Sequence, residues 1–316
     1  MSIRLGYQIP NFTYPGVPVE DLFDTVVAQA REAEAAGFDT VLVMDHLYQL
    51  PGIGAPENAM LEAYTTLGAL ASATSTIQLS ALVTGNTYRN PALLAKTVTT
   101  LDVVSKGRAV LGIGAGWFER EHHDLGFEFG TFGQRFERLE EALTIIAPML
   151  KGEKGELEGK WYTARGAMNN PRVRPTVPIM LGGSGEQKTF RLAARFADHM
   201  NIICDLDVLP HKVAVLRQRC EEIGRDPDTI ERTVTIDLVI RDSRASALEA
   251  YKAILAGSGG EFDESWAGPI GTPDEIADAI RPMNELGFRH ILIDTPSPYD
   301  PETLDRIGEV IERLNA

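Results

Sequence analysis

The feature that most constrains this chain is a regular alternation of short apolar runs with longer segments of helical period. Eight runs have the length and β-branched content of buried strands: 3–9, 40–44, 77–82, 108–113, 177–181, 199–203, 233–240 and 290–293. The helical segments lie at 20–36, 60–72, 91–104, 133–150, 185–196, 209–223, 245–255 and 272–286. Eight such units in 316 residues predict an α/β fold, a (β/α)8 TIM barrel that forms one domain over 1–316. An open doubly wound sheet would use about six strands.

Three segments interrupt the repeat: 47–59, 152–176 and 257–271. The first and last lie beyond the carboxyl ends of predicted strands, the end that carries the active site of a barrel, so we interpret them as insertions that act as lids or walls. The middle segment contains a possible hairpin at 157–167. Surface decoration or a subunit contact explains that segment equally well.

Composition excludes several classes of partner. A net charge of −15 repels nucleic acid and anionic membranes, so any anionic ligand must be held by local donors. The two cysteines, Cys204 and Cys220, are too few for a disulfide framework or a structural zinc site. Their scarcity favours a reducing cytoplasm. No apolar run approaches the length of a membrane span, and no signal segment opens the chain.

The stretch 178–198 combines a short buried strand, a glycine-rich turn and a helix predicted to begin at Gly185. Gly182, Gly183, Ser184 and Gly185 offer backbone N–H groups at the start of that helix, where anions bind. Lys188 and Arg191 add positive charge close behind. This pattern indicates a phosphate site, although an ordinary turn that needs glycine for tight packing has the same sequence.

Asp45 and His46 directly follow the second predicted strand. An imidazole exchanges protons near neutrality, so His46 is the best candidate for acid–base work. Asp45 is not expected to form a dyad with it because adjacent side chains diverge. The alternative is structural, with the aspartate capping a loop and the histidine packed at its edge.

The run Gly112–Gly116 resembles a dinucleotide fingerprint only superficially, because Trp117 stands where the third glycine is expected. We interpret Gly114 and Gly116 as bare backbone on which a planar ring can lie; steric relief around Trp117 is the alternative. The polar run 119–124, with its two histidines, has no ligand pair at helical spacing. It is therefore interpreted as a solvated face or a loop near the site, and no metal site is predicted.

Taken together, these motifs resemble the bacterial luciferase-like flavin superfamily, and within it the branch of oxidoreductases that use the deazaflavin coenzyme F420. The resemblance covers nearly the whole chain. It is carried by the segments 38–47, 82–96, 107–122, 135–143, 178–198 and 271–280, of which LVTGNTYRNPALLAK and PIMLGGSGEQKTFRLAARFAD are the most specific.

The resemblance implies a ring bound at the carboxyl ends of the strands, with hydride transfer at one face of the ring. Asp45 and His46 would lie beside the ring. A bulge behind it would carry a non-prolyl cis peptide at Ala81–Leu82 or the next bond. The cofactor would be lined by Ala81, Leu82, Val83, Thr84, Asn86, Gly114, Ala115 and Gly116, and Gly182, Gly183, Ser184 and Gly185 would take its phosphate.

One departure from the family bears on the substrate. Sugar-phosphate dehydrogenases of this branch carry a glutamate acid where this chain has Trp117, so Trp117 is interpreted as a wall for an apolar or aromatic substrate. The expected substrates are small organic molecules: enones, imines, nitroaromatics or alcohols. The acidic tail of F420 would need basic residues beyond the barrel rim, for which Arg89, Arg165, Arg172 and Arg174 are available.

Two cofactors and several functions stay open at this point. F420 is favoured, while FMN would make the chain a luciferase-type monooxygenase supplied by a partner flavin reductase. A non-catalytic flavin-binding barrel and a phosphate-binding isomerase are further alternatives, the last disfavoured because no carboxylate or lysine pair stands at the strand ends. The resemblance also implies a homodimer, and F420 chemistry implies a separate enzyme that reduces the cofactor.

Overall fold

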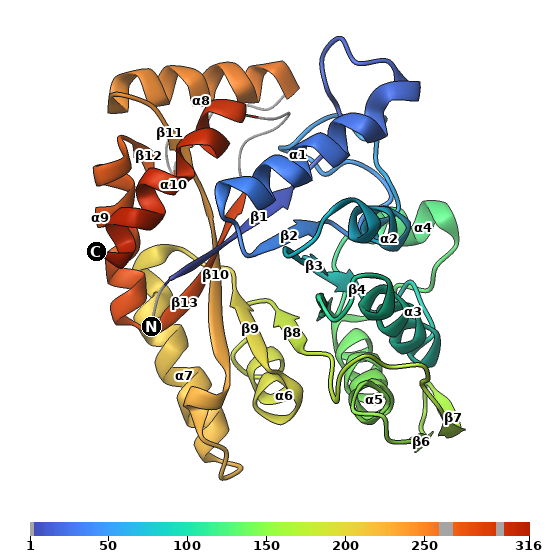
Figure 1. Cartoon of the computed structure of the whole chain (residues 1–316). Helices are drawn as coiled ribbons and strands as arrows, with labels where there is room; N and C mark the ends of the chain where they lie inside the picture. The colour runs from blue at the N-terminus through green and yellow to red at the C-terminus, as the bar shows by residue number, and fades with distance from the viewer. Residues whose placement is uncertain (1–2, 259–267, 295–299) are drawn as a thin grey trace. The chain divides into compact units, whose positions relative to one another are not determined.

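In the computed structural model, which describes residues 3–258, 268–294 and 300–316, strands and helices alternate along the chain (Figure 1). The chain divides into two compact units. The first unit comprises Met1–Glu62, Ala73–Gln78 and Arg232–Ala316, and the second comprises Ala63–Ser72 and Leu79–Glu231. Nothing in this division tests the expected single domain, which stays a prediction.

The first unit holds four parallel strands in the order β2-β1-β13-β10. Their bounds are Arg4–Ile9 for β1, Thr40–Val43 for β2, Glu231–Asp237 for β10 and Phe288–Asp294 for β13. The helices of this unit are α1 (Leu22–Ala36), α8 (Arg244–Ser258), α9 (Pro273–Glu285) and α10 (Pro301–Asn315). One face of the strands packs on helices: the hydroxyl of Tyr7 accepts a hydrogen bond from Gln29 of α1.

The second unit holds the parallel strands β3, β5, β8 and β9 in that order, with the short strand β4 also paired to β5. Their bounds are Gln78–Ala81 for β3, Thr84–Gly85 for β4, Ala109–Gly114 for β5, Ile179–Gly182 for β8 and His199–Ile202 for β9. The helices are α2 (Ala63–Ala73), α3 (Pro91–Val104), α4 (Glu119–Leu125), α5 (Phe132–Leu150), α6 (Thr189–Phe196) and α7 (Leu209–Glu221).

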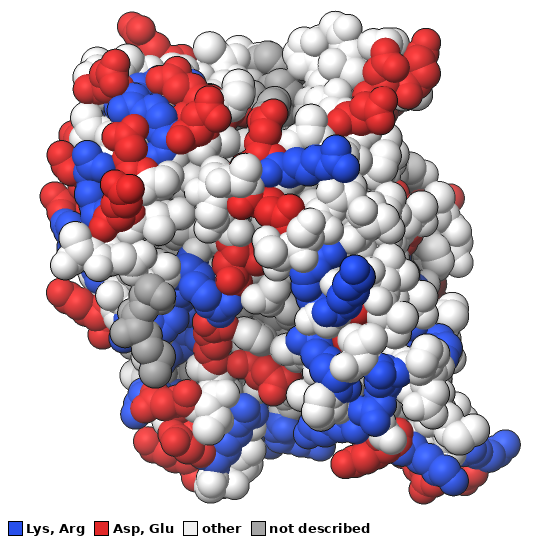
Figure 2. All heavy atoms as spheres, in the orientation of Figure 1, with Lys and Arg blue, Asp and Glu red and all other residues white. Residues whose placement is uncertain are grey.

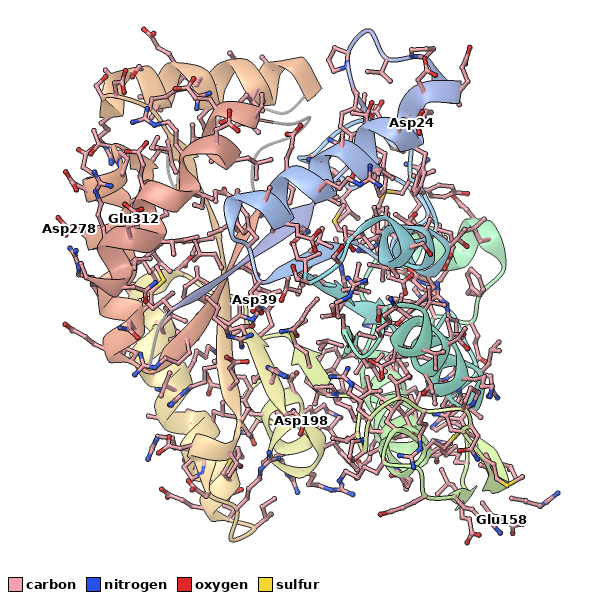
Figure 3. The ribbon with its side chains drawn as sticks, viewed as in Figure 1. Asp24, Asp39, Glu158, Asp198, Asp278 and Glu312 are labelled. Atoms are coloured by element: carbon pink, nitrogen blue, oxygen red, sulfur yellow. The ribbon has the colours of Figure 1, made fainter. Side chains whose placement is uncertain are left out.

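The eight long parallel strands and the helices that follow them make the (β/α)8 TIM barrel that the sequence predicts. Carboxylates tie the amino ends of the strands. Asp39, just before β2, accepts hydrogen bonds from Arg4 (2.6 Å) and Gln78 (2.9 Å), and in the second unit Asp198 accepts the backbone N–H of Ile179 (2.9 Å). Figure 3 labels both aspartates. In a barrel this is the end that stabilises the fold.

The inserted segments differ in their structure. Residues 47–59 contain no helix or strand, and the predicted hairpin is present as β6 (Gly155–Glu158) paired with β7 (Thr163–Ala167). Most of 257–271 lies outside the described residues. The strand predicted at 233–240 is wrong as a single element, because β10 ends at Asp237 and β11 (Val239–Ile240) pairs instead with β12 (Ile270–Gly271).

The surface carries both signs of charge. Figure 2 shows Lys and Arg side chains interspersed with Asp and Glu over the face drawn. Among the described residues, no helix has both the length and the apolar character needed to span a bilayer.

Candidate functional site

The bulge between β3 and β4 is held against bare backbone of β5. The peptide bond Leu82–Val83 is cis, which confirms the second of the two bonds predicted for it. A Cβ atom on Gly112 would lie 1.9 Å from the carbonyl oxygen of Ala81. No side chain fits there, so Gly112 is required for the close approach of the two strands.

The side chain of Val83 accounts for the absence of a side chain at two more positions. A Cβ on Gly114 would lie 3.0 Å from a Val83 methyl group, and one on Gly182 would lie 2.8 Å from the other. Gly116 has φ +79°, and a Cβ there would meet the hydroxyl of Thr87 at 2.8 Å. Packing against Val83 and Thr87 thus accounts for glycine at both positions, and the expectation that a planar ring lies on this backbone stays a prediction.

Thr84 and Asn86 are buried beside the carboxyl end of β5. The Thr84 hydroxyl bonds the hydroxyl of Tyr64 (2.6 Å), and the backbone N–H of Asn86 donates to the Gly114 carbonyl (3.0 Å). Asn86 is only 2% exposed, and its Nδ2 amide meets no acceptor of the described protein at full hydrogen-bonding geometry. Its side chain lies beside Tyr162, whose pKa burial raises and the Asn86 side chain lowers in part, so the Tyr162 hydroxyl is the polar group nearest to satisfying it.

The glycine-rich turn does not lead directly into a helix as predicted. Gly182 belongs to β8, and the N–H of Gly183, at φ +132°, donates to the Asn201 carbonyl (3.0 Å). Helix α6 begins at Thr189, which corrects the predicted start at Gly185, because a turn over 186–188 comes first. The N–H groups of residues 184–189 make no hydrogen bond within the described protein. Consecutive free N–H groups of this kind bind anions.

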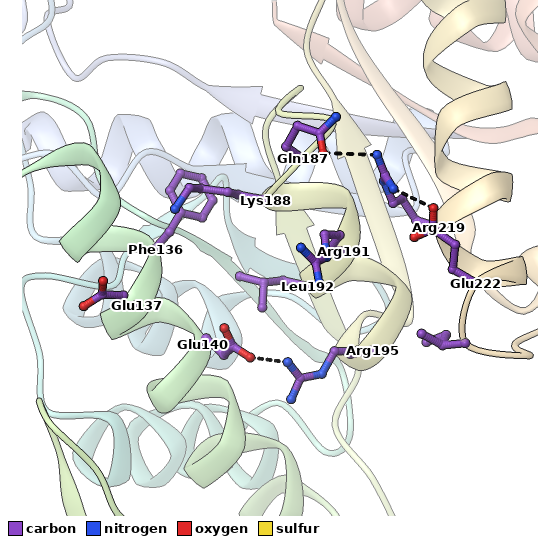
Figure 4. A pocket seen from close by; sticks show the side chains of 11 residues that line it. Phe136, Glu137, Glu140, Gln187, Lys188, Arg191, Leu192, Arg195, Arg219 and Glu222 are labelled. Carbon is purple, nitrogen blue, oxygen red and sulfur yellow. Dashed lines mark hydrogen bonds and ion pairs between the residues drawn. The ribbon is translucent and has the colours of Figure 1, made fainter.

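A cavity of about 400 Å³ adjoins this turn between α5, α6 and α7 (Figure 4). Two of its arginines are paired, Arg195 with Glu140 and Arg219 with Glu222. Lys188 and Arg191 have no ion pair or hydrogen bond from their side chains among the described residues, and the Lys188 ammonium lies 5.7 Å from the ring centre of Phe136. The cavity therefore keeps positive charge for an anionic ligand.

The arginines that the sequence offered for an acidic tail have other contacts. Arg174 pairs with Asp102 (2.7 Å), Arg165 with Glu158 of the hairpin (3.1 Å), and Arg172 donates to the Pro175 carbonyl (2.8 Å). Arg89 lies over the ring of Tyr64, 4.9 Å from its centre.

The polar run 119–124 forms α4, and its interpretation as a solvated face is wrong for Glu121 and His122, which are fully buried. His122 bonds the Thr87 hydroxyl through Nε2 (2.6 Å) and stacks on Tyr88, whose own hydroxyl donates to Glu121 (2.5 Å). These contacts hold the loop behind Gly116. Within the described part of the chain, no group of three or more His, Cys, Asp or Glu side chains is placed to hold a metal ion.

The remaining predicted residues differ in their setting. Trp117 is 61% exposed, with its ring against Phe118 (5.3 Å between centres). The structure brings the bulge, Gly114 to Gly116 and Gly182 together in the second unit, whereas Asp45 and His46 belong to the first. Asp45 is buried and His46 half-buried, just beyond the end of β2.

Sequence reasoning missed a carboxyl pair at the ends of β10 and β13. Asp237 and Asp294 are partners in register on these neighbouring strands. Burial raises the pKa of Asp237 to about 6, partly offset by the hydrogen bond from Tyr251 (3.1 Å). Burial, and then the charge of Asp237, raises the pKa of Asp294 well above its usual range. Asp294 directly follows the strand predicted at 290–293, but the strand predicted to run to 240 concealed Asp237.

Comparison with known proteins agrees with this fold and with these motifs. Residues 3–268 match the family model described as luciferase-like monooxygenase. The chain is 31% identical over 308 residues to the F420-dependent glucose-6-phosphate dehydrogenase of Microbacterium testaceum, covering 88% of this chain and 89% of that one. It is 31% identical over 232 residues to the F420-dependent hydroxymycolic acid dehydrogenase of Mycobacterium tuberculosis, covering 72% of this chain and 62% of that one.

Among solved structures, an F420-dependent secondary alcohol dehydrogenase in complex with an F420-acetone adduct superposes with a TM-score of 0.82 at 23% identity, covering 99% of both chains. At that identity the likeness concerns the fold. The family model and the two curated relatives concern the sequence, and they match over most of the chain. The chain therefore belongs to the luciferase-like monooxygenase family, in the branch that contains these F420-dependent dehydrogenases.

Proposed function

We propose that this protein is an F420-dependent oxidoreductase that moves a hydride between the coenzyme and a small organic substrate. The observation that carries the proposal is the run of backbone N–H groups at 184–189 that meet no acceptor among the described residues, beside Lys188 and Arg191, whose side chains form no ion pair or hydrogen bond with those residues. In a chain of net charge −15, such a site has to be built locally to hold an anion.

The residues present fit this coenzyme. The turn 182–185 would hold the phosphate, and Asn86 Nδ2 is a buried donor that the ring or its ribityl chain would satisfy. Ala81, Leu82, Val83, Thr84 and Gly114 to Gly116 would line the ring. When bound, the deazaflavin supplies a two-electron hydride carrier that reacts poorly with oxygen.

His46 and Trp117 are proposed to act on the substrate. The imidazole of His46 would give or take the proton at the substrate oxygen or nitrogen, with Asp45 fixing the loop that carries it. The exposed Trp117 ring would form an apolar wall. Trp117 stands where related sugar-phosphate dehydrogenases carry an acid, which favours enones, imines, nitroaromatics or alcohols as substrates. A homodimer and a separate cofactor-reducing enzyme are part of the proposal.

The cavity beside the glycine turn favours F420 over FMN. Both cofactors have a ribityl phosphate, but FMN ends there, whereas F420 continues into an acidic tail. The cavity begins at Gln187 and Lys188, directly after the turn, and has room for such an extension (Figure 4). We therefore propose that Lys188 and Arg191 contact the tail.

The test is an anaerobic fluorescence titration of the purified apoprotein with three probes: F420, the deazaflavin riboside that lacks phosphate and tail, and FMN. F420 is expected to bind most tightly. The double variant Lys188→Gln/Arg191→Gln should weaken F420 binding by roughly tenfold or more, because two charge-assisted contacts are lost, and leave the riboside unchanged.

Arg217→Gln is the matched control, since Arg217 is a surface arginine paired with Asp228 (2.8 Å) and does not line the cavity. Tighter binding of FMN than of F420 would reject the proposal in favour of a flavin enzyme. Binding of none of the three would mean that the glycine turn is structural.

A further inference from the structure

A row of three polar side chains crosses the carboxyl ends of neighbouring strands in the first unit. Gln8 of β1 is in register with Asp294 of β13, which is in register with Asp237 of β10. Partners in register on parallel strands lie about 4.8 Å apart and point to the same face of the sheet. The three side chains, here called the carboxyl row, therefore lie side by side.

The carboxyl row lies on the face of the sheet opposite the helices. A Cβ on Gly6 would contact Leu292 (2.6 Å) and Leu42 (3.2 Å), which places these residues on one side of the strands. Gln8 and Asp294 follow Gly6 and Leu292 by two positions, so they share that side. Tyr7 lies between, on the other face, against α1. The carboxyl row thus faces the interior of the barrel at the end where its ligands bind.

Among the described residues, the two carboxyl groups have no cationic partner: no Lys, Arg or His forms an ion pair with Asp237 or Asp294. The Tyr251 hydroxyl donates a hydrogen bond to Asp237. Arg241, the nearest arginine along the chain after β10, is held by Asp300 (2.9 Å) and Glu302 (3.0 Å). Both carboxyl groups are partly buried, and carboxylates withdrawn from water are normally paired, because an uncompensated charge there is costly.

Gln8 is an independent sign of a missing ligand. The residue is 5% exposed, and its amide, whose atoms are not themselves fully buried, forms no hydrogen bond with any described residue. An amide so largely withdrawn from water is ordinarily hydrogen-bonded. The carboxyl row therefore presents two acids and one unpartnered amide toward the same space.

We propose that the carboxyl row of Gln8, Asp294 and Asp237 binds the positively charged nitrogen of a substrate, an iminium ion or a protonated amine. Such a group donates hydrogen bonds to the carboxylates, and its positive charge compensates theirs, which no described Lys, Arg or His does. The Gln8 amide can accept or donate a hydrogen bond beside it. The same row repels a phosphorylated substrate. This inference rests on the proposed function, which supplies the hydride-transfer reaction. Among the substrate classes proposed there, it favours imines.

The experiment is isothermal titration of the full chain with three probes, both with and without bound oxidised F420. The probes are 2-methylpyrrolidine, its neutral analogue 2-methylcyclopentanone, and glucose 6-phosphate. The amine is expected to bind and the phosphate is not. Asp294→Asn and Asp237→Asn should each weaken amine binding by roughly tenfold to a hundredfold and leave the ketone within a few fold, because they remove charge at constant shape.

Asp278→Asn is the matched control, since Asp278 is an exposed aspartate paired with Arg281 on α9. Amine binding that is absent, or that survives in both asparagine variants, overturns the inference. The inference would also be overturned if the asparagine variants lost as much affinity for the ketone as for the amine, because the carboxyl row would then act by hydrogen bonding to neutral groups. Normal F420 binding with no amine binding rejects this inference alone, whereas absent F420 binding rejects the proposed function.

Discussion

Gly114 and Gly182 stand against the side chain of Val83, whereas Ser184 and Gly185 have backbone N–H groups that bond no protein acceptor. The first two are therefore explained by packing, and their replacement by alanine would disturb the bulge even in a protein without ligands. The second two are partly or fully exposed, so their N–H groups are open to water or to a bound anion. Whether a glycine is required for packing therefore depends on the space around its missing Cβ atom, whereas a role in ligand binding depends on its backbone N–H group.

His46 is the residue at which proton transfer is best tested. His46→Ala should lower kcat by about a hundredfold or more, since general acid–base groups contribute this much, and leave F420 affinity within a few fold. Steady-state kinetics with an enone or imine substrate, combined with fluorescence titration of F420, separates the two effects. The control is His123→Ala, an exposed histidine of α4 paired with Asp124. Unchanged kcat would remove His46 from the mechanism.

At the scale of elements, local chemistry sets most boundaries. Helix α5 begins at Phe132 because Thr131 and Gln134 form a capping box, with the Thr131 N–H donating to Gln134 Oε1 (2.8 Å). In the first unit, Glu34 of α1 accepts backbone N–H groups from Ser75 (2.9 Å), Thr76 (2.6 Å) and Ile77 (2.9 Å). One carboxylate thus holds the segment that leads into β3.

Glu34→Gln should lower the free energy of unfolding at pH 7 by about 1–2 kcal/mol, after allowing for solvent screening of this half-buried group. Partial burial alone would raise the pKa of Glu34, but the N–H groups of Thr76, Ile77 and Ser75 outweigh it and lower the pKa to about 2. The contribution is therefore complete above the ordinary value of 4.5 and is lost as pH falls toward 2.

Urea unfolding at pH 7 and pH 3 measures this effect, with Asp24→Asn, an exposed acidic residue of the same helix, as the control. Equal stabilities of wild type and Glu34→Gln at pH 7 would show that the bonded network contributes nothing.

At the scale of the whole molecule, the two ends of the strands have different roles. Asp39 and Asp198 bind strand residues at the amino ends and have partners there. Asp237 and Asp294, at the carboxyl ends, have no cationic partner among the described residues, and their raised pKa values record the cost of burying them. This division between a stabilising end and a ligand-binding end is general in barrels.

That cost makes stability depend on pH. Because the pKa of Asp237 is about 6 in the folded protein and 3.8 ordinarily, the folded state holds a proton that the unfolded state releases between these values. Stability therefore falls as pH rises through this window. Asp237→Asn removes the effect, so above pH 6 it should be more stable than wild type by about 1–3 kcal/mol. Thermal unfolding at pH 4.5 and pH 7.5 measures the difference, which should shrink at the lower pH.

Features that depend on near neighbours along the chain could be predicted from the amino-acid sequence. The eight strand and helix alternations, the cis peptide within one bond and the hairpin at 157–167 follow from local periodicity, glycine placement and family motifs. Boundaries that depend on a partner strand failed: β10 ends early because Val239 and Ile240 pair with Ile270 and Gly271.

Contacts between residues far apart in the sequence depend on the fold. It placed Val83 against Gly114 and Gly182, and buried Glu121 and His122 beside Thr87. It also aligned Gln8, Asp294 and Asp237, which are far apart in the sequence. The physical reason is register. Periodicity along the chain tells which side chains share a face, but which residues stand side by side depends on how strands pair across the sheet.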